Sequence, residues 1–511
     1  MKIKTYKKLN KKELLRRLLS NGLFPEKLSG VLKSNQFGAK IIQNHFSKNI
    51  STDDFYYAFY NQSRESNGFR RLGIPNPYPY YLLSEILVDH WSDIEKVIGK
   101  INQSNSRSQI RPKVNNKGKR LVSMSHYNKD EDFFNLIINK SIGKKYIVKT
   151  DISNYYPSIY THAIAWALVG RKIAKMKKVN KGLWYNKIDF HCRMLQDKET
   201  IGIPIGPDTS SIIGEIILSA VDSTLTKYEY TRFIDDYTAF VDSKDYADEF
   251  LIDLANSLNE YRLSLNHKKT FIQELPDFLN TLWVSELKII INNFLSKKEY
   301  NKKDINNIEI FWDKSLEIQN SNANSSVLRY SAKAFSSKIF IDGDTIDYAI
   351  RRLGYLCVYY PYITDCWVKL IYRSRNNIRK NTNIKKNIIL ISETIMRKCI
   401  QQRNSDAVTY ILWLFKKLKY QFKDYSFIIN EVKKYKDCVS LTLLRHYDKE
   451  MKIKTRFDPI IDEIKSEELE NEYWLFIYES YKLDRKNKIF NNILHKDIYD
   501  HLLKLGVSFV N

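Results

Sequence analysis

The chain has 511 residues, of which 43% are apolar, so it can build sizeable cores and is not a disordered tail protein. Its 83 lysine and arginine residues outnumber its 58 aspartate and glutamate residues, and the formal charge of +25 favours a polyanionic partner such as nucleic acid. The five cysteines form no CxxC pair, which argues against a zinc ribbon and a disulfide framework. Neither a secretory leader nor an uncharged apolar run of about 18 residues is apparent, which argues against a membrane span. We therefore expect a cytoplasmic protein.

The first segment that carries chemistry is a short strand with an acid at its end. Residues 146–152 (Tyr-Ile-Val-Lys-Thr-Asp-Ile) predict an apolar strand that ends at Asp151. Further along, residues 202–207 contain two glycines and two prolines and predict a loop that leads into a helix over residues 210–218. Taken alone, the acid could cap a helix and the loop could be a simple flexible connection.

Two more segments follow in the same half of the chain. Residues 230–241 predict a hairpin with Asp235 and Asp236 at its turn. Residues 263–270 (Leu-Ser-Leu-Asn-His-Lys-Lys-Thr) follow a predicted helix. An Asp-Asp pair by itself more often marks an ordinary turn, so the order and spacing of all four segments must support a functional interpretation.

The second half of the chain is predicted to be helical. Thirteen of the 16 glycines and nine of the 11 prolines lie at or before Pro276, and few breakers remain after it. Apolar residues there recur at helical spacing, in one set at Val408, Ile411, Leu412 and Phe415 and in another at Val439, Leu443 and Tyr447. We therefore expect an α+β domain over residues 1–295 and an all-helical domain over residues 296–511, either a bundle or a HEAT-like stack of helix pairs. The polar residues 319–326 predict an exposed loop or linker.

Carboxylates at a strand end and a neighbouring turn suit phosphoryl transfer. That reaction asks the protein mainly to position groups and to neutralise charge. Two Mg²⁺ ions roughly 3.5–4 Å apart stabilise the attacking and leaving oxygens of an in-line displacement. Because Mg²⁺ prefers carboxylate oxygens and keeps several waters, two or three aspartates on rigid strands suffice. Asp151, Asp235 and Asp236 are the candidates.

The four segments resemble, in order, the palm motifs A, B, C and D of reverse transcriptases. Phe-Ile-Asp-Asp at residues 233–236 resembles the family's Tyr-x-Asp-Asp, and residues 151–156 resemble its Asp-x-x-x-x-aromatic motif. The resemblance implies a fingers and palm fold for the N-terminal part. It also implies that Asp151, Asp235, Asp236 and the backbone carbonyl of Ile152 bind two Mg²⁺ ions, with Mn²⁺ as an alternative.

The same resemblance assigns nucleotide-binding roles. Tyr156 would be the gate that excludes a ribose 2′-hydroxyl, and Asn154 and Gly206 would line the pocket, although either could be a plain turn residue. Lys269 would lie near the leaving pyrophosphate, or else be a solvated surface lysine. Arg70 and Arg71 resemble the fingers residues that hold the triphosphate. The basic residues 117–120 compete with them for that role.

Within that family the chain is most similar to the abortive-infection (Abi) reverse transcriptases of bacteria, of the AbiK-like kind. Residues 70–80 and 154–162 carry this resemblance, and the helical C-terminal half is similar in architecture. It implies antiphage defence, template-independent DNA synthesis primed by a tyrosine hydroxyl, a single-stranded DNA product attached to the protein, and a homo-oligomer. Ile205 stands where ordinary members have Gln beside the template base, which fits untemplated synthesis. Tyr6 is one candidate primer among 35 tyrosines, and we leave the primer unassigned.

Two alternatives stay open. The chain could be a templated reverse transcriptase of the retron or group II intron kind. It could also be an inactive polymerase fold that acts as a nucleic-acid-binding scaffold, although the intact acid triad argues against that hypothesis. The helical half could serve as a protein-interaction platform in either case.

Overall fold

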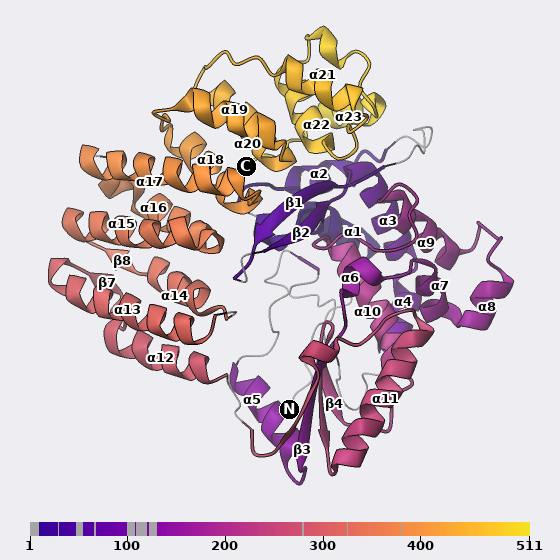
Figure 1. The fold of residues 1–511 in the computed structure, drawn as a ribbon. Helices are drawn as coiled ribbons and strands as arrows, with labels where there is room; N and C mark the ends of the chain where they lie inside the picture. The colour runs from indigo at the N-terminus through magenta and orange to yellow at the C-terminus, as the bar shows by residue number, and fades with distance from the viewer. Residues whose placement is uncertain are drawn as a thin grey trace. The chain divides into compact units, whose positions relative to one another are not determined.

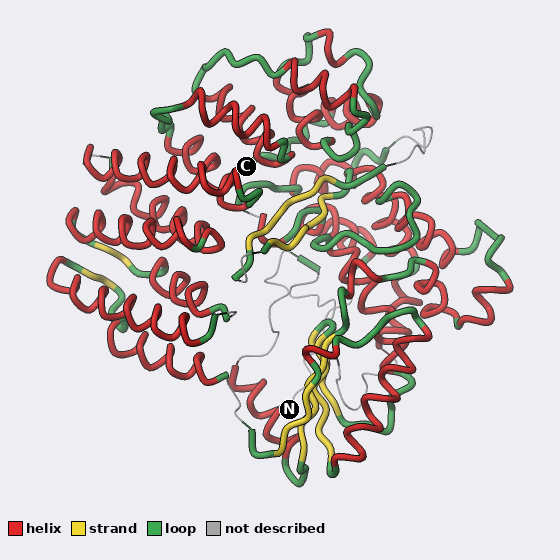
Figure 2. The backbone as a smooth tube through the Cα atoms, viewed as in Figure 1, coloured by secondary structure: helices red, strands yellow, loops and turns green. Residues whose placement is uncertain are grey.

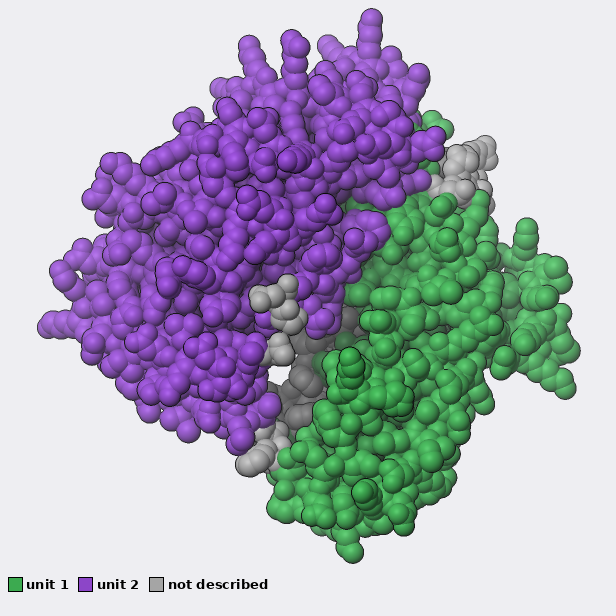
Figure 3. All heavy atoms as spheres, in the orientation of Figure 1, with its two compact units in different colours: residues 1–58, 73–279, 494–511 green, residues 59–72, 280–493 purple. Residues whose placement is uncertain are grey.

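A computed structural model defines residues 10–28, 30–46, 55–65, 68–99, 108, 120–121, 130–277, 281–323, 325–379 and 381–511. Tyr6 and residues 117–119 lie outside the described residues. Contacts divide the chain into two compact units, coloured separately in Figure 3. Unit 1 comprises residues 1–58, 73–279 and 494–511, and unit 2 comprises residues 59–72 and 280–493. The domain boundary after residue 295 stays a prediction.

The centre of unit 1 is a four-stranded antiparallel sheet in the order β4-β5-β3-β6. Its strands are β3 (Tyr146–Asp151), β4 (Tyr230–Phe233), β5 (Asp236–Val241) and β6 (Phe271–Glu274). In β5, Tyr237 and residues 239–241 are buried, and in β3, Ile147 and Val148 are buried. Both predicted strand segments are therefore confirmed, and so is the hairpin at residues 230–241.

Helices lie beside this sheet, as Figures 1 and 2 show. The segment after the predicted loop forms α10 (Asp208–Asp222), which starts after Pro207 with an acid in its first turn, where the helix dipole favours negative charge. The helix α11 (Lys244–Glu260), capped by the Ser243 hydroxyl, packs on β3 and β5. The other helices of unit 1 are α1 (Lys11–Arg17), η1 (Leu18–Gly22), η2 (Glu26–Leu28), α2 (Asn35–Ile41), α3 (Pro77–Asp89), α4 (Trp91–Gly99), α5 (Asp130–Ser141), α6 (Tyr155–Ser158), α7 (His162–Val169), α8 (Arg171–Met176), α9 (Trp184–Met194), η3 (His267–Lys269) and α23 (Lys496–Lys504).

Unit 2 is a stack of helices that runs from α12 to α22 (Figure 1). Many of these helices pack on the next and the next but one, for example α16 on α18 and α18 on α20. The predicted apolar faces are buried in α18 and α20, so the expectation of a helical C-terminal half in an α+β protein is confirmed. The helices are α12 (Leu282–Phe294), η4 (Lys302–Asp304), α13 (Ile305–Ser321), α14 (Val327–Ser336), α15 (Gly343–Tyr359), η5 (Pro361–Ile363), α16 (Thr364–Ile378), α17 (Thr382–Gln401), α18 (Ser405–Leu418), α19 (Tyr425–Tyr435), α20 (Cys438–Glu450), α21 (Asp458–Ser466), α22 (Trp474–Leu483) and η6 (Lys488–Phe490).

Part of the predicted polar loop is helical. Residues 319–321 end α13, and Gln319 is buried, with its side-chain oxygen accepting the backbone N–H of Leu328. A buried amide can end a helix when its polar atoms are satisfied, which composition alone does not reveal. Two short parallel strands, β7 (Glu299–Tyr300) and β8 (Ile339–Phe340), also lie in this unit.

Two short segments belong to the unit that is formed mainly by distant parts of the sequence. Residues 59–72 belong to unit 2, and residues 494–511 belong to unit 1. Most of the hairpin of β1 (Ala58–Ser63) and β2 (Phe69–Ile74) belongs to unit 2, and β1 hydrogen-bonds to α18. The Ser63 hydroxyl donates to Asp406 at 2.7 Å, and burial raises the pKa of the Asp406 carboxyl to about 6. The C-terminal residues return to unit 1, where the backbone N–H of Lys33 donates to the Phe509 carbonyl at 2.8 Å.

The cysteines lie inside the two units. All five are buried, and each is a free thiol. Within the described residues, no helix combines the length and the apolar character that crossing a membrane requires.

Candidate active site

The fold brings the three predicted aspartates together at one end of the sheet. Asp151 is the last residue of β3, and it lies directly opposite Asp236, the first residue of β5. A two-residue turn of Ile234 and Asp235 connects β4 to β5, because Phe233 pairs with Asp236. The turn thus places Asp235 beside the paired Asp151 and Asp236.

Mutual repulsion and burial perturb these carboxyl groups. Burial raises the pKa of Asp235 to about 7, and the negative charges of Asp151 and Asp236, with a hydrogen bond between the Asp235 and Asp151 side chains, act in the same direction. The pKa of Asp236 is also raised, first by desolvation and then by Asp151, against the opposing charge of Lys269. The cluster therefore holds more negative charge than its surroundings balance.

Lys269 is the cation of this cluster. Its Nζ lies 2.5 Å from Oδ2 of Asp151, while the lysine side chain is 61% exposed and the aspartate side chain only 9%. The backbone N–H of Asn266 donates to the Asp151 carbonyl at 2.7 Å and the Thr150 and Thr270 hydroxyls lie 2.7 Å apart, so the segment that carries Lys269 is fixed to the end of β3. Lys269 therefore contacts the site and is not simply a solvated lysine, although its role toward pyrophosphate stays a prediction.

The carbonyl of Ile152 faces the same cluster. Ile152 is paired with Leu265, but the hydrogen bonds of this bridge run from Ser153 N–H to Ser264 and from Asn266 N–H to Asp151. In an antiparallel ladder this pattern leaves the N–H and C=O of the central residue pointing to the other side of the strand. For Ile152 that side is the one on which β5 and its aspartates lie.

The donor set fits a divalent ion, although no such site is fully assembled. Within the described ranges, no group of three or more His, Cys, Asp and Glu side chains already has an arrangement that could hold a metal ion. One Asp151 oxygen is bonded to Lys269. Three clustered carboxylates with a backbone carbonyl nevertheless match the oxygen ligands that Mg²⁺ prefers, and the raised pKa of Asp235 marks the charge that a cation would neutralise. Binding through Oδ2 of Asp151 would require that oxygen to release Lys269.

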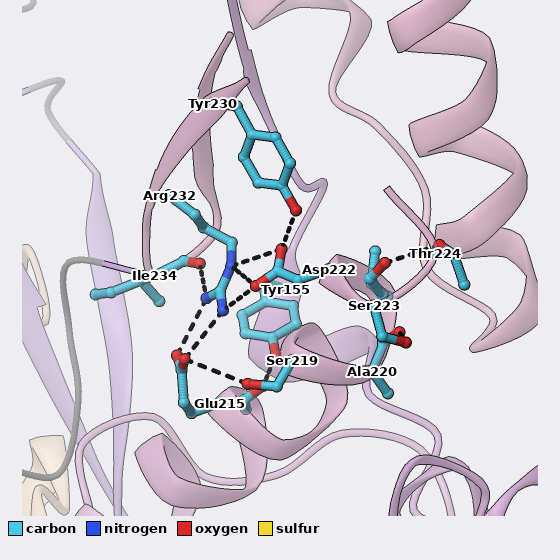
Figure 4. Close-up of polar contacts among 12 residues, drawn as sticks. Tyr155, Glu215, Ser219, Ala220, Asp222, Ser223, Thr224, Tyr230, Arg232 and Ile234 are labelled. Atoms are coloured by element: carbon cyan, nitrogen blue, oxygen red, sulfur yellow. Dashed lines mark hydrogen bonds and ion pairs between the residues drawn. The ribbon is translucent and has the colours of Figure 1, made fainter. Parts of the chain in front are cut away.

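A buried ionic network supports the turn from behind (Figure 4). The Arg232 side chain is fully buried in β4 and donates to Glu215 at 3.0 Å and to Asp222 at 2.7 Å, both on α10. The Tyr230 hydroxyl donates to Asp222 at 2.8 Å. Burial alone lowers the pKa of Arg232, but the carboxylates of Asp222 and Glu215 outweigh burial and raise it well above its usual value. The guanidinium therefore stays charged and ties α10 to β4.

The same arginine reaches the turn that carries Asp235. Its Nη1 donates to the carbonyl of Ile234 at 2.9 Å, immediately before Asp235. Ile234 has a φ of 57°, a left-handed conformation that a β-branched residue rarely adopts and that costs of order 1–3 kcal/mol. Arg232 thus holds the strained turn that presents Asp235.

Tyr156 lies over the α10 helix, next to a small crevice. The neighbouring Tyr155 is buried and donates its hydroxyl to the Gly214 carbonyl at 2.7 Å. A Cβ at Gly214 would come within 3.1 Å of the Tyr155 hydroxyl and 3.4 Å of the Tyr156 ring, so glycine allows both tyrosines to approach the helix. Tyr156, Ser211 and Gly214 line a crevice that also reaches Ile234 of the turn between β4 and β5.

The other predicted nucleotide-binding residues lie at turns or on an exposed strand. Asn154 is exposed in a left-handed conformation at the start of α6. Gly206 packs against Pro25 so closely that a Cβ would lie 2.5 Å from the proline ring. Arg70 and Arg71 are exposed on β2 and belong to unit 2, so their contact with nucleotide stays a prediction. Arg120, from the competing basic run, donates to Asp208 at 2.5 Å.

Sequence reasoning missed the Arg232 network. Its signal is an arginine next to aromatic strand residues, together with two acids seven positions apart, Glu215 and Asp222, in the largely apolar residues 212–222 of the helix. Charges inside apolar runs usually have partners when they are buried. The spacing places both acids on one face of the helix.

Residues 84–301 match the family model described as reverse transcriptase (RNA-dependent DNA polymerase). The chain therefore carries a reverse transcriptase domain, and the acid cluster lies within it. No curated protein matches the chain.

Three of the solved structures found to be similar are telomerases. The apo enzyme of Candida tropicalis shares 13% identity over 79% of this chain and 70% of its own, with a TM-score of 0.31. Its form truncated from the C-terminal domain shares 17% identity over 45% of this chain, with a TM-score of 0.30, and the chain spans only 52% of its length. The Candida albicans enzyme in complex with a TWJ fragment of telomeric RNA shares 12% identity over 79% of this chain and 66% of its own, with a TM-score of 0.29. Similarity this distant adds nothing to the assignment.

Proposed function

We propose that the chain is a DNA polymerase that adds deoxynucleotides at the cluster of Asp151, Asp235 and Asp236. The observation that supports this most strongly is the meeting of three carboxylates, with Lys269 as their counter-charge, at a strand end and a hairpin turn within a reverse transcriptase domain. In the reaction, a hydroxyl oxygen forms a bond to the α-phosphorus of a dNTP, and the bond to the bridging oxygen breaks to release pyrophosphate.

The three carboxylates and the carbonyl of Ile152 would hold two Mg²⁺ ions, or Mn²⁺, which when bound neutralise charge on the attacking and leaving oxygens. The side chains of the protein have separate tasks. Lys269, freed from Asp151, would lie beside the departing pyrophosphate as a counter-charge. Tyr156, over Gly214, would restrict the sugar to a deoxyribose. Arg70, Arg71, Asn154 and Gly206 would contribute to the nucleotide site, as the resemblance implies.

We further propose that synthesis needs no template and begins at a tyrosine hydroxyl of the protein, with the single-stranded DNA product remaining attached. The resemblance to abortive-infection reverse transcriptases supports this, and so does Ile205, an apolar residue where a template-side contact would need a polar one. The same resemblance supports antiphage defence in the cytoplasm and a homo-oligomeric assembly. A reverse transcriptase that copies a template is the alternative that the family description favours.

Intact mass distinguishes these two modes of synthesis. Purified protein is incubated with each dNTP and Mg²⁺ without template or primer, and the mass is measured before and after nuclease digestion. Protein-primed synthesis predicts nuclease-sensitive mass added to the protein, with a residual nucleotide on one tyrosine, and none in Asp235→Ala. If DNA forms only on a supplied primed template and the protein mass stays unchanged, the untemplated, protein-primed proposal is wrong.

A further inference from the structure

A second pocket lies in unit 1 on the helices α7, α8 and α9, and it has a volume of about 910 Å³. This volume is at the upper end of the range typical of ligand sites. Seven of the residues that line it are lysine or arginine, and Asp189 is its one acidic residue among those described. That acid is already balanced, because its carboxylate lies 2.6 Å from Nδ1 of His162 and 3.5 Å from Nε of Arg193. The pocket therefore has a large excess of uncompensated positive charge.

Aromatic rings hold two of these cations in place. The guanidinium of Arg171 lies over the Trp166 ring at 4.8 Å from its centroid, and that of Arg262 lies over the Tyr160 ring at 4.1 Å. Such stacking fixes the plane of each guanidinium and leaves its outer edge available to donate hydrogen bonds. Fixed planar cations beside aromatic rings are suited to phosphate groups and to the faces of unpaired bases.

The wall of the pocket contains polar atoms with no hydrogen-bond partner among the described residues, and the imidazole of His191 supplies one of them. Nδ1 of His191 is buried and makes no hydrogen bond to any part of the chain that the structure describes. A buried polar atom of this kind usually has a partner, and it costs about 1–3 kcal/mol when it does not. His191 lines the pocket, but this nitrogen is itself enclosed and is not open to a ligand there.

This pocket is separate from the acid cluster. None of its lining residues is an aspartate of the cluster or lines the crevice beside Tyr156. In Figure 1, α8 lies at the right-hand edge of unit 1, away from the strand β3 that ends at Asp151. The segment that builds it is unusually basic: residues 171–181 contain six lysines and arginines and no acid.

We propose that this pocket binds a short stretch of single-stranded nucleic acid, with phosphates on its lysines and arginines and bases against its aromatic and guanidinium faces. A concave pocket of this size admits a few unpaired nucleotides but not a duplex. Binding here requires neither metal ions nor catalysis, so the inference is independent of the proposed polymerase reaction. Lys175, Lys178 and Lys187 are exposed around the pocket and are its most accessible phosphate contacts.

The test measures binding of fluorescent oligothymidylate and oligouridylate to the full chain by anisotropy, in EDTA and over a range of salt. The variant replaces Lys175, Lys178 and Lys187 by Gln. The matched control replaces three exposed lysines of the same unit that lie outside the pocket, Lys40, Lys145 and Lys244. We expect the pocket variant to bind at least 10-fold more weakly than the control, with the slope of log K against log salt reduced by about 2, since each phosphate contact to a single strand contributes about 0.7. Comparison of oligothymidylate with oligouridylate shows whether the pocket prefers DNA or RNA.

Two results would overturn the proposal. The first is equal binding by the pocket variant and the control variant. The second is binding of vesicles containing phosphatidylserine that the pocket substitutions abolish while oligonucleotide binding is unchanged, because this would assign the pocket to an anionic surface. Photocrosslinking with 5-iodouracil gives an independent readout: crosslinks are expected at Tyr160, Trp166 or Phe190, which line the pocket, and crosslinks confined to other segments would contradict it.

Discussion

Replacing Arg232 by methionine tests whether the buried network supports the turn that carries Asp235. The substitution keeps an unbranched side chain in the core but removes every hydrogen bond to Glu215, Asp222 and the Ile234 carbonyl. Glu215 is only 6% exposed and Asp222 only 2%, so water cannot replace the lost cation. Methionine leaves two buried carboxylates with little compensation.

The expected loss of stability is about 3–5 kcal/mol, the range seen when one partner of a buried ion pair is removed. Neutralising both acids in the Arg232→Met background, by Glu215→Gln and Asp222→Asn, should recover at least half of that loss, because the stranded charges are then absent. The substitution Asp222→Asn leaves the Tyr230 hydroxyl only a neutral amide oxygen as its acceptor, so full recovery is not expected. Nucleotide incorporation should fall in Arg232→Met beyond any effect of unfolding, because the turn at Ile234 loses its tether.

The assay is urea unfolding followed by circular dichroism. The matched control is Arg351→Met, which breaks an exposed ion pair to Asp347 at 2.8 Å and should cost less than about 1 kcal/mol. A loss below about 1 kcal/mol for Arg232→Met, or no recovery when both acids are neutralised, would show that the buried network does not support the turn.

Three further predictions concern the acid cluster and its neighbours. The pKa of Asp235 is raised in the folded protein to about 7 from an unfolded value near 4, so folding is destabilised as the pH rises from about 4 to 7, by about 4 kcal/mol in total. In EDTA, Asp235→Asn should therefore be more stable than the parent by about 4 kcal/mol at pH 8 and lose this advantage near pH 4 in urea titrations, whereas equal stability at pH 8 would contradict the assigned burial. Lys269→Ala should slow nucleotide incorporation by about 10-fold or more, while Lys268→Ala, at the exposed neighbouring lysine, should have little effect. Equal rates for the two variants would show that Lys269 has no role in the reaction. Tyr156→Ala should raise incorporation of ribonucleotides relative to deoxynucleotides in competition assays, and an unchanged ratio would show that Tyr156 is not the sugar gate.

Local sequence patterns predict the strands and turns of the site, but they do not predict the long-range contacts that bring these elements together. The apolar run before Asp151 and the alternation around Asp235 are short-range signals, and β3 and the β4–β5 hairpin form where these signals place them. The convergence of the acids depends on strand pairing between segments far apart in the sequence, and it was predictable only through the order of the four motifs. The sequence is equally consistent with Lys269 as a solvated surface lysine and as a residue of the site, and only its contact with Asp151 distinguishes the two.

Local sequence patterns also do not predict how segments far apart in the chain pack on each other. Ser63 and Asp406 are 343 positions apart, and nothing in the hairpin that carries Ser63 indicates that it packs on α18. The return of the C-terminal residues to unit 1 has the same cause, since backbone pairing between Leu32 and Val510 needs no distinctive side chains. The Arg232 network is intermediate: its charges are visible in the sequence, but their burial is decided by how α10 packs behind β4.

Whether Asp151, Asp235 and Asp236 form the catalytic centre of a polymerase can be tested directly. Incorporation of labelled dNTPs with Mg²⁺ is measured for the parent and for Asp235→Asn, each with and without a primed template. We expect incorporation by the parent in at least one of the two conditions and a loss of at least about 100-fold in Asp235→Asn, with the fold intact by circular dichroism. Parent-level incorporation by Asp235→Asn, or none by the parent in either condition, would contradict the assignment of this cluster.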